Sequence, residues 1–456
     1  MMKKFLPFIY AFATNGCSFL ISALSTLVIP RFIGITEYGY WQLYMFYVSY
    51  VGIFHLGWND GIYLRYGGKQ YDSLDKETLK KQFIAQLLMH LIIALIIFLI
   101  SRFIPNHNKK IICVYVLICM LITNLRCMLI YVLQMTGRIR EYAIVNTLDR
   151  LGFGISVILL LYFNRNTYIS FIFGDLFCHT CSLLLAMYYC KDIFASHICS
   201  WVGIIKEIYA NISCGSKLMF ANLASMLITG VVRLGIEHSW NIETFGKISL
   251  TISISNFLIT FINSVGIVVY PMLKNLNLSQ QKKIFLKINN LFEFSYAILI
   301  CYYPLYYFIR NLLPEYKDTA NYILFLFPVC IYEGKLSLLY LTYLKALRKE
   351  KQLMIINIFT VFISLISTLF TTILFHNLNM AVLSITILIF IRSTLCELYL
   401  AKILGIYVAQ NIIKEIVLSI VFILANSIFP PVIAAIIYIL SVMIISLWKL
   451  FCYKIK

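Results

Sequence analysis

The chain has 456 residues, of which 61% are hydrophobic and 12% charged, with a mean hydropathy of +0.86. Soluble domains hold about 45–50% apolar and about 25% charged residues, so this composition excludes a soluble protein and predicts an all-α integral membrane protein. The formal charge of +19 is typical of loop anchoring at a membrane, and we expect no nucleic-acid partner. Nearly all of the 13 cysteines fall in apolar runs, which predicts no disulfide framework.

Apolar runs long enough to cross a bilayer follow one another along the chain. A spanning helix needs about 20 apolar residues, and by this criterion we expect about 14 spans. Pro304 and Pro328 fall inside two of them and should bend them, and Pro430-Pro431 should form the last turn. The predicted spans cover residues 7–30, 40–64, 83–104, 111–133, 143–163, 168–189, 216–236, 248–272, 288–309, 321–344, 353–375, 380–401, 414–429 and 432–450.

Lys and Arg residues are distributed unevenly between alternate loops. Loops on the side of the two termini hold 22 of them, and loops on the other side hold 8. Because positive charge is retained on the cytoplasmic side, we expect both termini in the cytoplasm and an even number of spans.

The chain also repeats itself weakly. Pro30-Arg31, with Glu37 to Gly39 after it, recurs as Val232-Arg233 with Glu243 to Gly246 after it. This pattern predicts two six-helix lobes that form a parallel pseudo-repeat, followed by a C-terminal helix pair. The expected domains are an N-terminal lobe at 1–190, a cytoplasmic linker at 191–216, a C-terminal lobe at 217–404, and the last two spans with a cytoplasmic tail at 405–456.

Two spans around Thr123 to Gly154 form a predicted helical hairpin with charges deep inside it. Arg126 and Arg150 each lie 12 residues from Arg138 in the hairpin turn, and Asp149 is beside Arg150. Charged side chains at membrane depth persist only where they face protein or water. Arg126 and Asp149 can pair across the hairpin as a structural ion pair. Arg150 then lacks a partner in the sequence, and we expect it to serve a substrate.

Several short motifs resemble those of bacterial O-antigen flippases, the polysaccharide repeat-unit translocases of the multidrug/oligosaccharidyl-lipid/polysaccharide exporter superfamily. The resemblance covers about residues 5–404, although Val232 stands where members often have an Asp. It rests on Pro30-Arg31 with Glu37-Tyr38-Gly39, Leu56 to Gly61 with Arg65, Gln134 to Arg138 with Tyr142, and Gly215 to Leu218 with Arg233.

This resemblance implies two lobes around a cavity that opens alternately to either side of the bacterial inner membrane. The substrate would be an undecaprenyl-diphosphate-linked oligosaccharide of O-antigen or capsule type, carried from the cytoplasmic to the outer leaflet. Polysaccharide polymerase machinery is a candidate partner. We expect no cofactor, no metal and no enzymatic activity.

A lipid-linked sugar diphosphate needs a wet, cationic interior, and Arg binds phosphate with a planar fork. The candidate cavity cations are Arg150, Arg126, Arg233, Arg392, Lys335 and Arg65. The candidate ion-coupling acids are Asp60, Asp149, Asp175, Glu293 and Glu333, with Glu397 as a further one.

Each of these charges also has a structural interpretation. Glu333 and Lys335 could screen each other near water, and Asp60 with Arg65 could anchor the end of span 2. His179, like the other histidines in apolar runs, is interpreted as a core imidazole. The spacing of Cys178 to Cys181 predicts no metal site, because no second ligand cluster accompanies it.

Two other functions remain open. A related exporter of drugs or of another lipid-linked precursor would favour a smaller, more acidic cavity, which the number of Arg residues argues against. A membrane polysaccharide polymerase or ligase would need catalytic residues in a long exported loop. The predicted exported loops are all short, the longest lying near Ser101 to Lys110 and Arg310 to Asn321.

Overall fold

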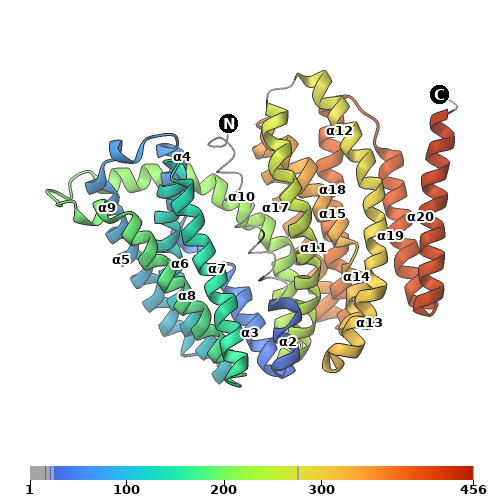
Figure 1. The fold of residues 1–456 in the computed structure, drawn as a ribbon, viewed down its shortest axis with the longest axis horizontal. Coiled ribbons are helices and arrows are strands. Elements are labelled where there is room, and N and C mark those ends of the chain that lie inside the picture. Colours follow the sequence, from blue (N-terminus) through green and yellow to red (C-terminus); the bar gives the residue numbers. More distant parts are fainter. Residues whose placement is uncertain (1–15, 17–20, 22–24, 275–276, 455–456) are drawn as a thin grey trace. The chain divides into compact units, whose positions relative to one another are not determined.

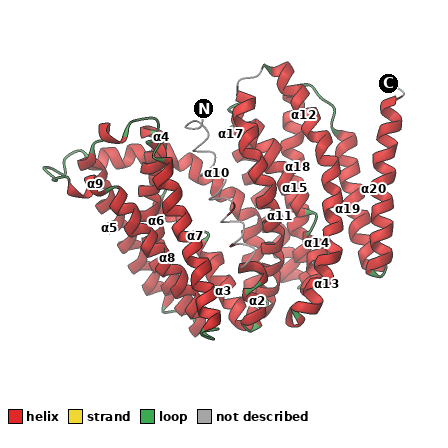
Figure 2. Ribbon diagram, in the orientation of Figure 1, coloured by secondary structure: helices red, strands yellow, loops and turns green. Residues whose placement is uncertain are grey.

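The structure is a computed structural model that describes Gly16, Ile21 and residues 25–274 and 277–454. Throughout these described residues, helices are joined by loops and turns, with no strand (Figure 1; Figure 2). Ten described helices are long and apolar enough to cross a membrane. The chain is therefore an all-α, multi-pass membrane protein, as its composition predicts. The first predicted span, 7–30, lies almost entirely outside the described residues.

The chain divides into two compact units, residues 1–223 and 224–456. In the first unit, α5, α6, α7 and α8 coincide with the predicted spans three to six. The elements of this unit are α2 (Ile29–Phe32), α3 (Ile35–Val48), η1 (Val51–His55), α4 (Trp58–Tyr66), η2 (Tyr71–Ser73), α5 (Lys76–Ser101), α6 (His107–Met135), α7 (Ile139–Tyr162), α8 (Tyr168–Tyr189), α9 (Lys191–Ala195) and the first part of α10 (Ile204–Ser239).

Side-chain caps fix where several of these helices begin. Asp75, Asn106 and Thr167 each accept a hydrogen bond from the backbone N–H three residues further on, at the starts of α5, α6 and α8. Such caps satisfy N–H groups that have no partner inside the helix. At their starts α5 and α6 therefore extend about one or two turns beyond the apolar runs that predict them, whereas α8 begins at the predicted residue.

The second predicted span, 40–64, is not one continuous helix. Leu56 and Gly57 adopt positive φ angles of 54° and 80°, and they separate α3 and η1 from α4. A Cβ on Gly61 would lie 1.9 Å from the Asn211 carbonyl oxygen, and one on Gly215 would lie 2.0 Å from the Gly57 carbonyl oxygen. The break and the missing side chains allow α4 and α10 to pack backbone against backbone.

Helix α10 begins at Ile204, inside the segment that the sequence predicts as a linker. Arg65 Nη1 lies 2.8 Å from Glu207 Oε1, and Asn211 Nδ2 donates to Gln82 Oε1 at 2.6 Å. These contacts join α10 to α4 and α5. The first turns of α10 are thus a packed part of the first unit, whereas residues from Ala224 onward belong to the second.

The second unit has its most buried helices at the centre. Within an 18-residue apolar stretch of each, 78% of the residues are buried in the segment from Thr319 to Ala346 and 61% in α18, against 17% in α5 of the first unit. The elements are α11 (Ile242–Lys274), α12 (Leu278–Phe292), η3 (Glu293–Cys301), α13 (Tyr302–Leu312), η4 (Pro314–Tyr316), α14 (Thr319–Leu326), α15 (Val329–Lys335), η5 (Leu336–Tyr340), α16 (Leu341–Ala346), α17 (Glu350–Thr368), η6 (Leu369–Leu374), α18 (Leu378–Leu404), α19 (Ala409–Ile428) and α20 (Pro431–Lys454).

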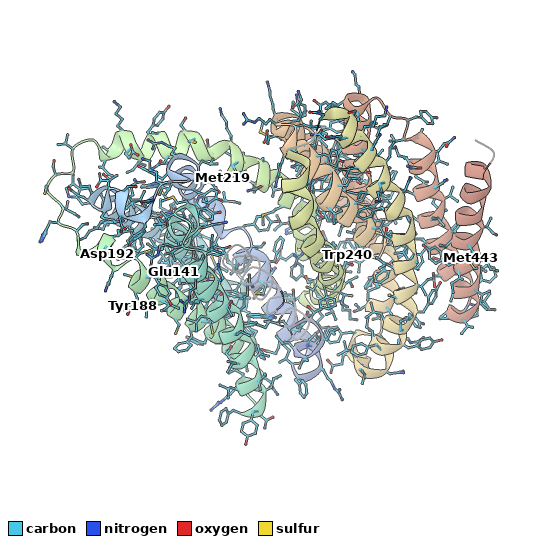
Figure 3. The ribbon with its side chains drawn as sticks, turned by 45° about the horizontal axis from the view of Figure 1, so that its top comes forward. Glu141, Tyr188, Asp192, Met219, Trp240 and Met443 are labelled. Carbon is cyan, nitrogen blue, oxygen red and sulfur yellow. The ribbon has the colours of Figure 1, made fainter. Side chains whose placement is uncertain are left out.

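Prolines mark helix interruptions in this unit. Pro328 stands between α14 and α15, and Pro304 follows the change from η3 to α13. The turn predicted at Pro430-Pro431 is the place where α19 ends and α20 begins. Trp240, labelled in Figure 3, lies at the junction of α10 and α11. It stacks on His376, with ring centroids 4.6 Å apart.

Candidate functional site

A cavity of about 250 Å³ lies inside the second unit, among α10, α11, α14, α15 and α18. Apolar side chains and small hydroxyl or amide groups share its wall with three charged residues, Arg233, Glu333 and Arg392, which the sequence analysis singles out. The lining consists of Ser225, Met226, Thr229, Arg233, Ile252, Ser255, Asn256, Ile259, Leu326, Val329, Glu333, Ile385, Ile389 and Arg392.

Arg392 on α18 is held in one orientation from three sides. Its Nε donates to Asn357 Oδ1 at 2.9 Å, and its Nη2 donates to Ser225 Oγ at 2.7 Å. Its Nη1 lies 3.7 Å from Glu333 Oε1, and only 2% of the residue is exposed. A guanidinium fixed in this way presents its charge to the cavity without loss of further side-chain entropy on binding.

Arg233 on α10 supplies the second guanidinium. Its Nη2 donates to Ser249 Oγ at 3.0 Å, and its Cζ lies 5.5 Å from the centre of the Phe245 ring. With one carboxylate, Glu333, against two guanidinium groups, the charged groups of the cavity wall sum to a positive charge. Such a wall suits an anionic group, and Arg forks match phosphate oxygens in particular.

Lys335, also predicted as a cavity cation, is not at this cavity. Its Nζ donates to both carboxylate oxygens of Glu397 at 3.2 Å and also to Glu415 Oε1. Asn289 Nδ2 donates to Glu397 Oε1 at 3.3 Å, and Lys335 and Glu397 are each 1% exposed. The sequence places Glu333 beside Lys335 as its screening partner, but the helix turns Glu333 toward Arg392 instead. Lys335 thus binds α15 to α18 and α19.

The first unit contains the ion pair predicted across the α6–α7 hairpin. Arg126 Nη1 lies 2.8 Å from Asp149 Oδ2 and donates to Ser182 Oγ at 3.1 Å. Ser182 in turn donates to the Val145 carbonyl oxygen at 3.0 Å. The Asp149 side chain is 4% exposed and that of Arg126 14%, so α6, α7 and α8 meet at a nearly dry polar contact.

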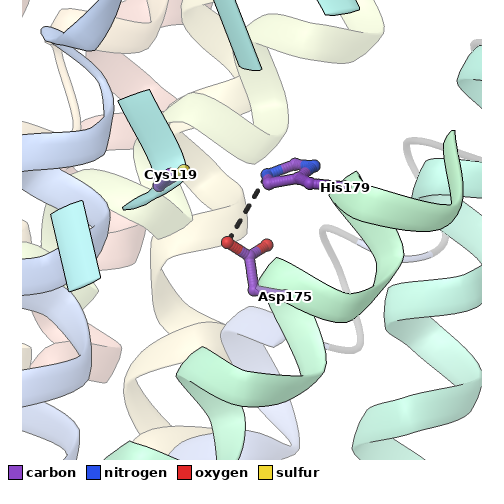
Figure 4. A group of neighbouring side chains, drawn as sticks. All are labelled: Cys119, Asp175 and His179. Carbon is purple, nitrogen blue, oxygen red and sulfur yellow. Dashed lines mark ion pairs between the residues drawn. The ribbon is translucent and has the colours of Figure 1, made fainter. Parts of the chain in front are cut away.

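His179 extends this contact into a chain of charged groups. Its Nδ1 lies 2.6 Å from Asp149 Oδ1, and its Nε2 lies 3.4 Å from Asp175 Oδ2, one helical turn earlier on α8 (Figure 4). Tyr44 on α3 donates to the same Asp175 oxygen at 2.8 Å. Two predicted coupling acids, Asp149 and Asp175, therefore meet at one imidazole.

Cys119 on α6 lies near Asp175 and His179 (Figure 4). The three ligand atoms lie within 4.8 Å of one another. A structural zinc site uses four protein ligands, and this group offers three. The group therefore falls short of a closed structural zinc site.

The remaining predicted site residues lie apart from both clusters. Arg150 on α7 is exposed and has no hydrogen bond or ion pair among the described residues. Arg65 joins α4 to α10 through Glu207, and Asp60 is buried with Oδ2 3.9 Å from His55 Nε2. Glu293 lies in η3, and its side chain is outside the described part of the chain.

Some residues of these sites were not predicted. Asn357 and Ser225, which orient Arg392, carry no signal in the sequence because uncharged polar residues are common in spanning helices. Glu415 does have a signal in the sequence, because it is an acid inside the apolar run predicted at 414–429. His179 was interpreted as a core imidazole, and only the fold brings carboxylates to both of its ring nitrogens.

No protein-family model matches the chain, and no curated protein matches it. Solved structures do match it. One is the lipid II flippase MurJ in an inward closed conformation, with a TM-score of 0.67, 13% identity, and 99% of each chain covered. Another is an inward-facing multidrug resistance MATE family transporter of the MOP superfamily, with a TM-score of 0.63, 11% identity, and 86% of this chain and 98% of that chain covered. The chain has the fold of these membrane transporters.

Proposed function

We propose that the chain is an alternating-access flippase that moves undecaprenyl-diphosphate-linked oligosaccharide repeat units, of O-antigen or capsule type, to the outer leaflet of the bacterial inner membrane. The observation that carries this proposal is the cavity with Arg233 and Arg392 inside a multi-pass membrane protein. The sequence motifs of O-antigen flippases and the structural likeness to a lipid II flippase support it.

The chemistry of the substrate explains why two guanidinium groups are needed. A diphosphate head group is anionic and strongly hydrated, and it crosses a bilayer only if the protein replaces its water. Arg stays charged when it is dehydrated and donates two parallel hydrogen bonds to phosphate oxygens. Hydroxyl groups on the same wall, such as that of Thr229, offer further hydrogen bonds to phosphate or sugar.

Membrane sidedness follows the distribution of Lys and Arg. In this proposal both termini and the segment from Lys191 to the start of α10 are cytoplasmic. The two predicted lobes give the substrate access alternately from the cytoplasmic and the outer side of the membrane. Arg150, which is exposed and has no described partner, is proposed as a second contact for the head group. Polysaccharide polymerase machinery is the proposed partner that receives the product.

Replacing the cavity arginines in cells that lack their own repeat-unit flippase tests the proposal. We expect the variants Arg233→Gln and Arg392→Lys to reach the membrane at wild-type level. Each should lower surface polysaccharide by roughly 10–100-fold, because a charge-assisted hydrogen bond contributes about 1.5–3 kcal/mol. Arg310→Gln, which changes an exposed arginine at the end of α13, is the matched control. Normal surface polysaccharide with both Arg233→Gln and Arg392→Lys, each tested alone, would contradict the proposal.

The second candidate function is export of drugs or of another lipid-linked precursor, and the likeness to a multidrug resistance MATE transporter favours keeping it. A cavity for cationic drugs needs an excess of acids, whereas this one holds two arginines and one glutamate. Drug resistance conferred by the chain, with no restored surface polysaccharide, would select this alternative.

A further inference from the structure

His179 has a carboxylate oxygen at each of its two ring nitrogens. Asp149 Oδ1 is 2.6 Å from Nδ1, and Asp175 Oδ2 is 3.4 Å from Nε2. A neutral imidazole has one N–H and one nitrogen lone pair. In that state one ring nitrogen would point its lone pair at a carboxylate oxygen in a nearly dry site, which is unfavourable. One added proton, either on the imidazole or on a carboxyl group, removes this repulsion because it places a hydrogen between His179 Nε2 and Asp175 Oδ2.

The charges around this imidazole also require that proton. The groups that face the site are Tyr44 from α3, Cys119 and Arg126 from α6, Asp149 from α7, and Asp175, Cys178 and Ser182 from α8. Arg126 neutralises one of the two carboxylates, so the other remains when the imidazole is neutral. One added proton makes the site electrically neutral, and a net charge at membrane depth is costly.

We propose that Asp149, His179 and Asp175 form a proton-binding site, and that the ion coupled to transport is a proton taken up and released there. This inference rests on the proposed transport function. On uptake, a hydronium ion transfers one proton to His179 Nε2 or to Asp175 Oδ2, so that one O–H bond of the hydronium ion breaks as the new N–H or O–H bond forms, and water is left. On release, the same proton returns to water.

The two ends of the site have different roles. Asp149 is 4% exposed and holds Nδ1 of His179 through the shorter contact, while Arg126 fixes its other oxygen. Asp175 and His179 are 10% and 13% exposed and face each other across the longer, 3.4 Å contact. Proton exchange therefore occurs at the Asp175 end, and Asp149 is a positioning residue that orients the ring. Histidine suits the task because its charge changes readily between about pH 5 and pH 8.

The proton can be observed without any substrate. The purified protein, labelled with ¹⁵N-histidine in lipid nanodiscs, contains seven histidines, and His179→Gln assigns the signal of interest. We expect both ring nitrogens of His179 to be protonated at pH 7, and only one in Asp149→Asn/Asp175→Asn. A neutral ring with a carboxylic-acid infrared band that disappears in Asp175→Asn also supports the site. A neutral ring without such a band would overturn the proposal.

Coupling is tested in vesicles that hold the protein and undecaprenyl-diphosphate-linked oligosaccharide. If one proton is coupled, a gradient of one pH unit supports an accumulation ratio of about tenfold across the bilayer. His179→Gln should equilibrate substrate but lose this response, while His197→Gln, in an exposed loop, should keep it. Zinc and chelator should change neither result, and a requirement for zinc would overturn the assignment.

Wild-type flipping that ignores the pH gradient would also refute proton coupling. No flipping by the wild-type protein would contradict the proposed function instead, and the ring-nitrogen signals would still decide whether the proton is bound.

Discussion

The two units both bury a cationic group between two carboxylates, but the cation differs. In the first unit the imidazole of His179 lies between Asp149 and Asp175, and in the second the ammonium of Lys335 lies between Glu397 and Glu415. An imidazole ordinarily changes its charge between about pH 5 and pH 8, whereas the ordinary pKa of a lysine ammonium is about 10.4.

This difference indicates different tasks for similar clusters. The side chains of Lys335 and Glu397 are each 1% exposed. Together with Glu415 they form the Lys335 cluster, which joins α19 of the C-terminal helix pair to α15 and α18. We interpret it as a structural cluster that holds these helices together and keeps its charges. The His179 cluster is partly open at one end and holds a group that changes charge, which is what a coupled site requires. Substitutions in the two clusters and at two more exposed charges test this contrast through their different effects on stability.

Removing the ammonium from the second unit should have the largest effect. Lys335→Met leaves Glu397 and Glu415 facing each other in a buried site, and breaking such a cluster costs about 3–5 kcal/mol. We expect the variant to be depleted from membranes and to melt at a clearly lower temperature in detergent. Lys335→Met/Glu397→Gln/Glu415→Gln, which removes all three charges, should recover much of the loss. If Lys335→Met melted at the same temperature as the wild-type protein, the cluster would not hold these helices together.

Removing Arg126 from the first unit should cost less, about 2–3 kcal/mol. Asp149 keeps His179 as a partner at 2.6 Å, and that ring can carry a positive charge. Arg126→Gln should therefore lower membrane abundance without abolishing it, and low pH should partly restore thermal stability. If its loss matched that of Lys335→Met and did not respond to pH, the two clusters would be equivalent and the comparison would fail.

The ion pair between Lys247 and Asp318 gives a smaller, pH-dependent effect. Lys247 Nζ lies 2.7 Å from Asp318 Oδ2, and hydrogen bonding to Lys247 lowers the pKa of the Asp318 carboxyl. Its contribution is therefore present above the unfolded pKa of about 3.9 and is lost as pH falls through the folded value. The Asp318 side chain is 49% exposed, so Asp318→Asn should cost only about 0.2–1 kcal/mol at pH 7 and less than that at about pH 2. Melting temperatures at both pH values check this, and an equal cost at both would contradict it.

Arg150→Gln should have the smallest effect on stability, within about 0.5 kcal/mol, because the side chain is exposed and has no described partner. It should nevertheless lower export of surface polysaccharide if Arg150 contacts the head group. Arg150→Lys restores charge without the planar fork and should rescue export in part. Wild-type export by Arg150→Gln would remove Arg150 from the substrate path, and loss of the protein from the membrane would make it structural.

The sequence predicts the spans well where one apolar run makes one helix, as at α6 and α8. It fails at the second span. The break at Leu56-Gly57 lets α4 pack against the backbone of Asn211 and Gly215 in α10, and those residues are distant in the sequence. The start of α10 at Ile204 was missed for a similar reason, because polar side chains such as Glu207 and Asn211 stabilise it through contacts with α4 and α5.

For the candidate sites, sequence reasoning identifies residue types better than partners. The pair of Arg126 and Asp149 is predictable because one hairpin places both at the same depth. Arg233, Glu333 and Arg392 are predicted individually, but their common cavity depends on the packing of five helices. Lys335 is predicted as a cavity cation, with screening by Glu333 as its structural interpretation. Neither expectation includes Glu397 and Glu415, because the helix points the side chains of Glu333 and Lys335 in different directions.

Flipping of a defined substrate in reconstituted vesicles tests the central claim most directly. Purified protein and undecaprenyl-diphosphate-linked oligosaccharide are placed in the same bilayer, and an enzyme outside the vesicles reports how fast inner-leaflet sugar becomes accessible. We predict rapid exchange with the wild-type protein and with Arg310→Gln, and exchange close to that of protein-free vesicles with Arg233→Gln/Arg392→Gln. Exchange by the wild-type protein no faster than in protein-free vesicles, or equally fast with the double variant, would contradict the account.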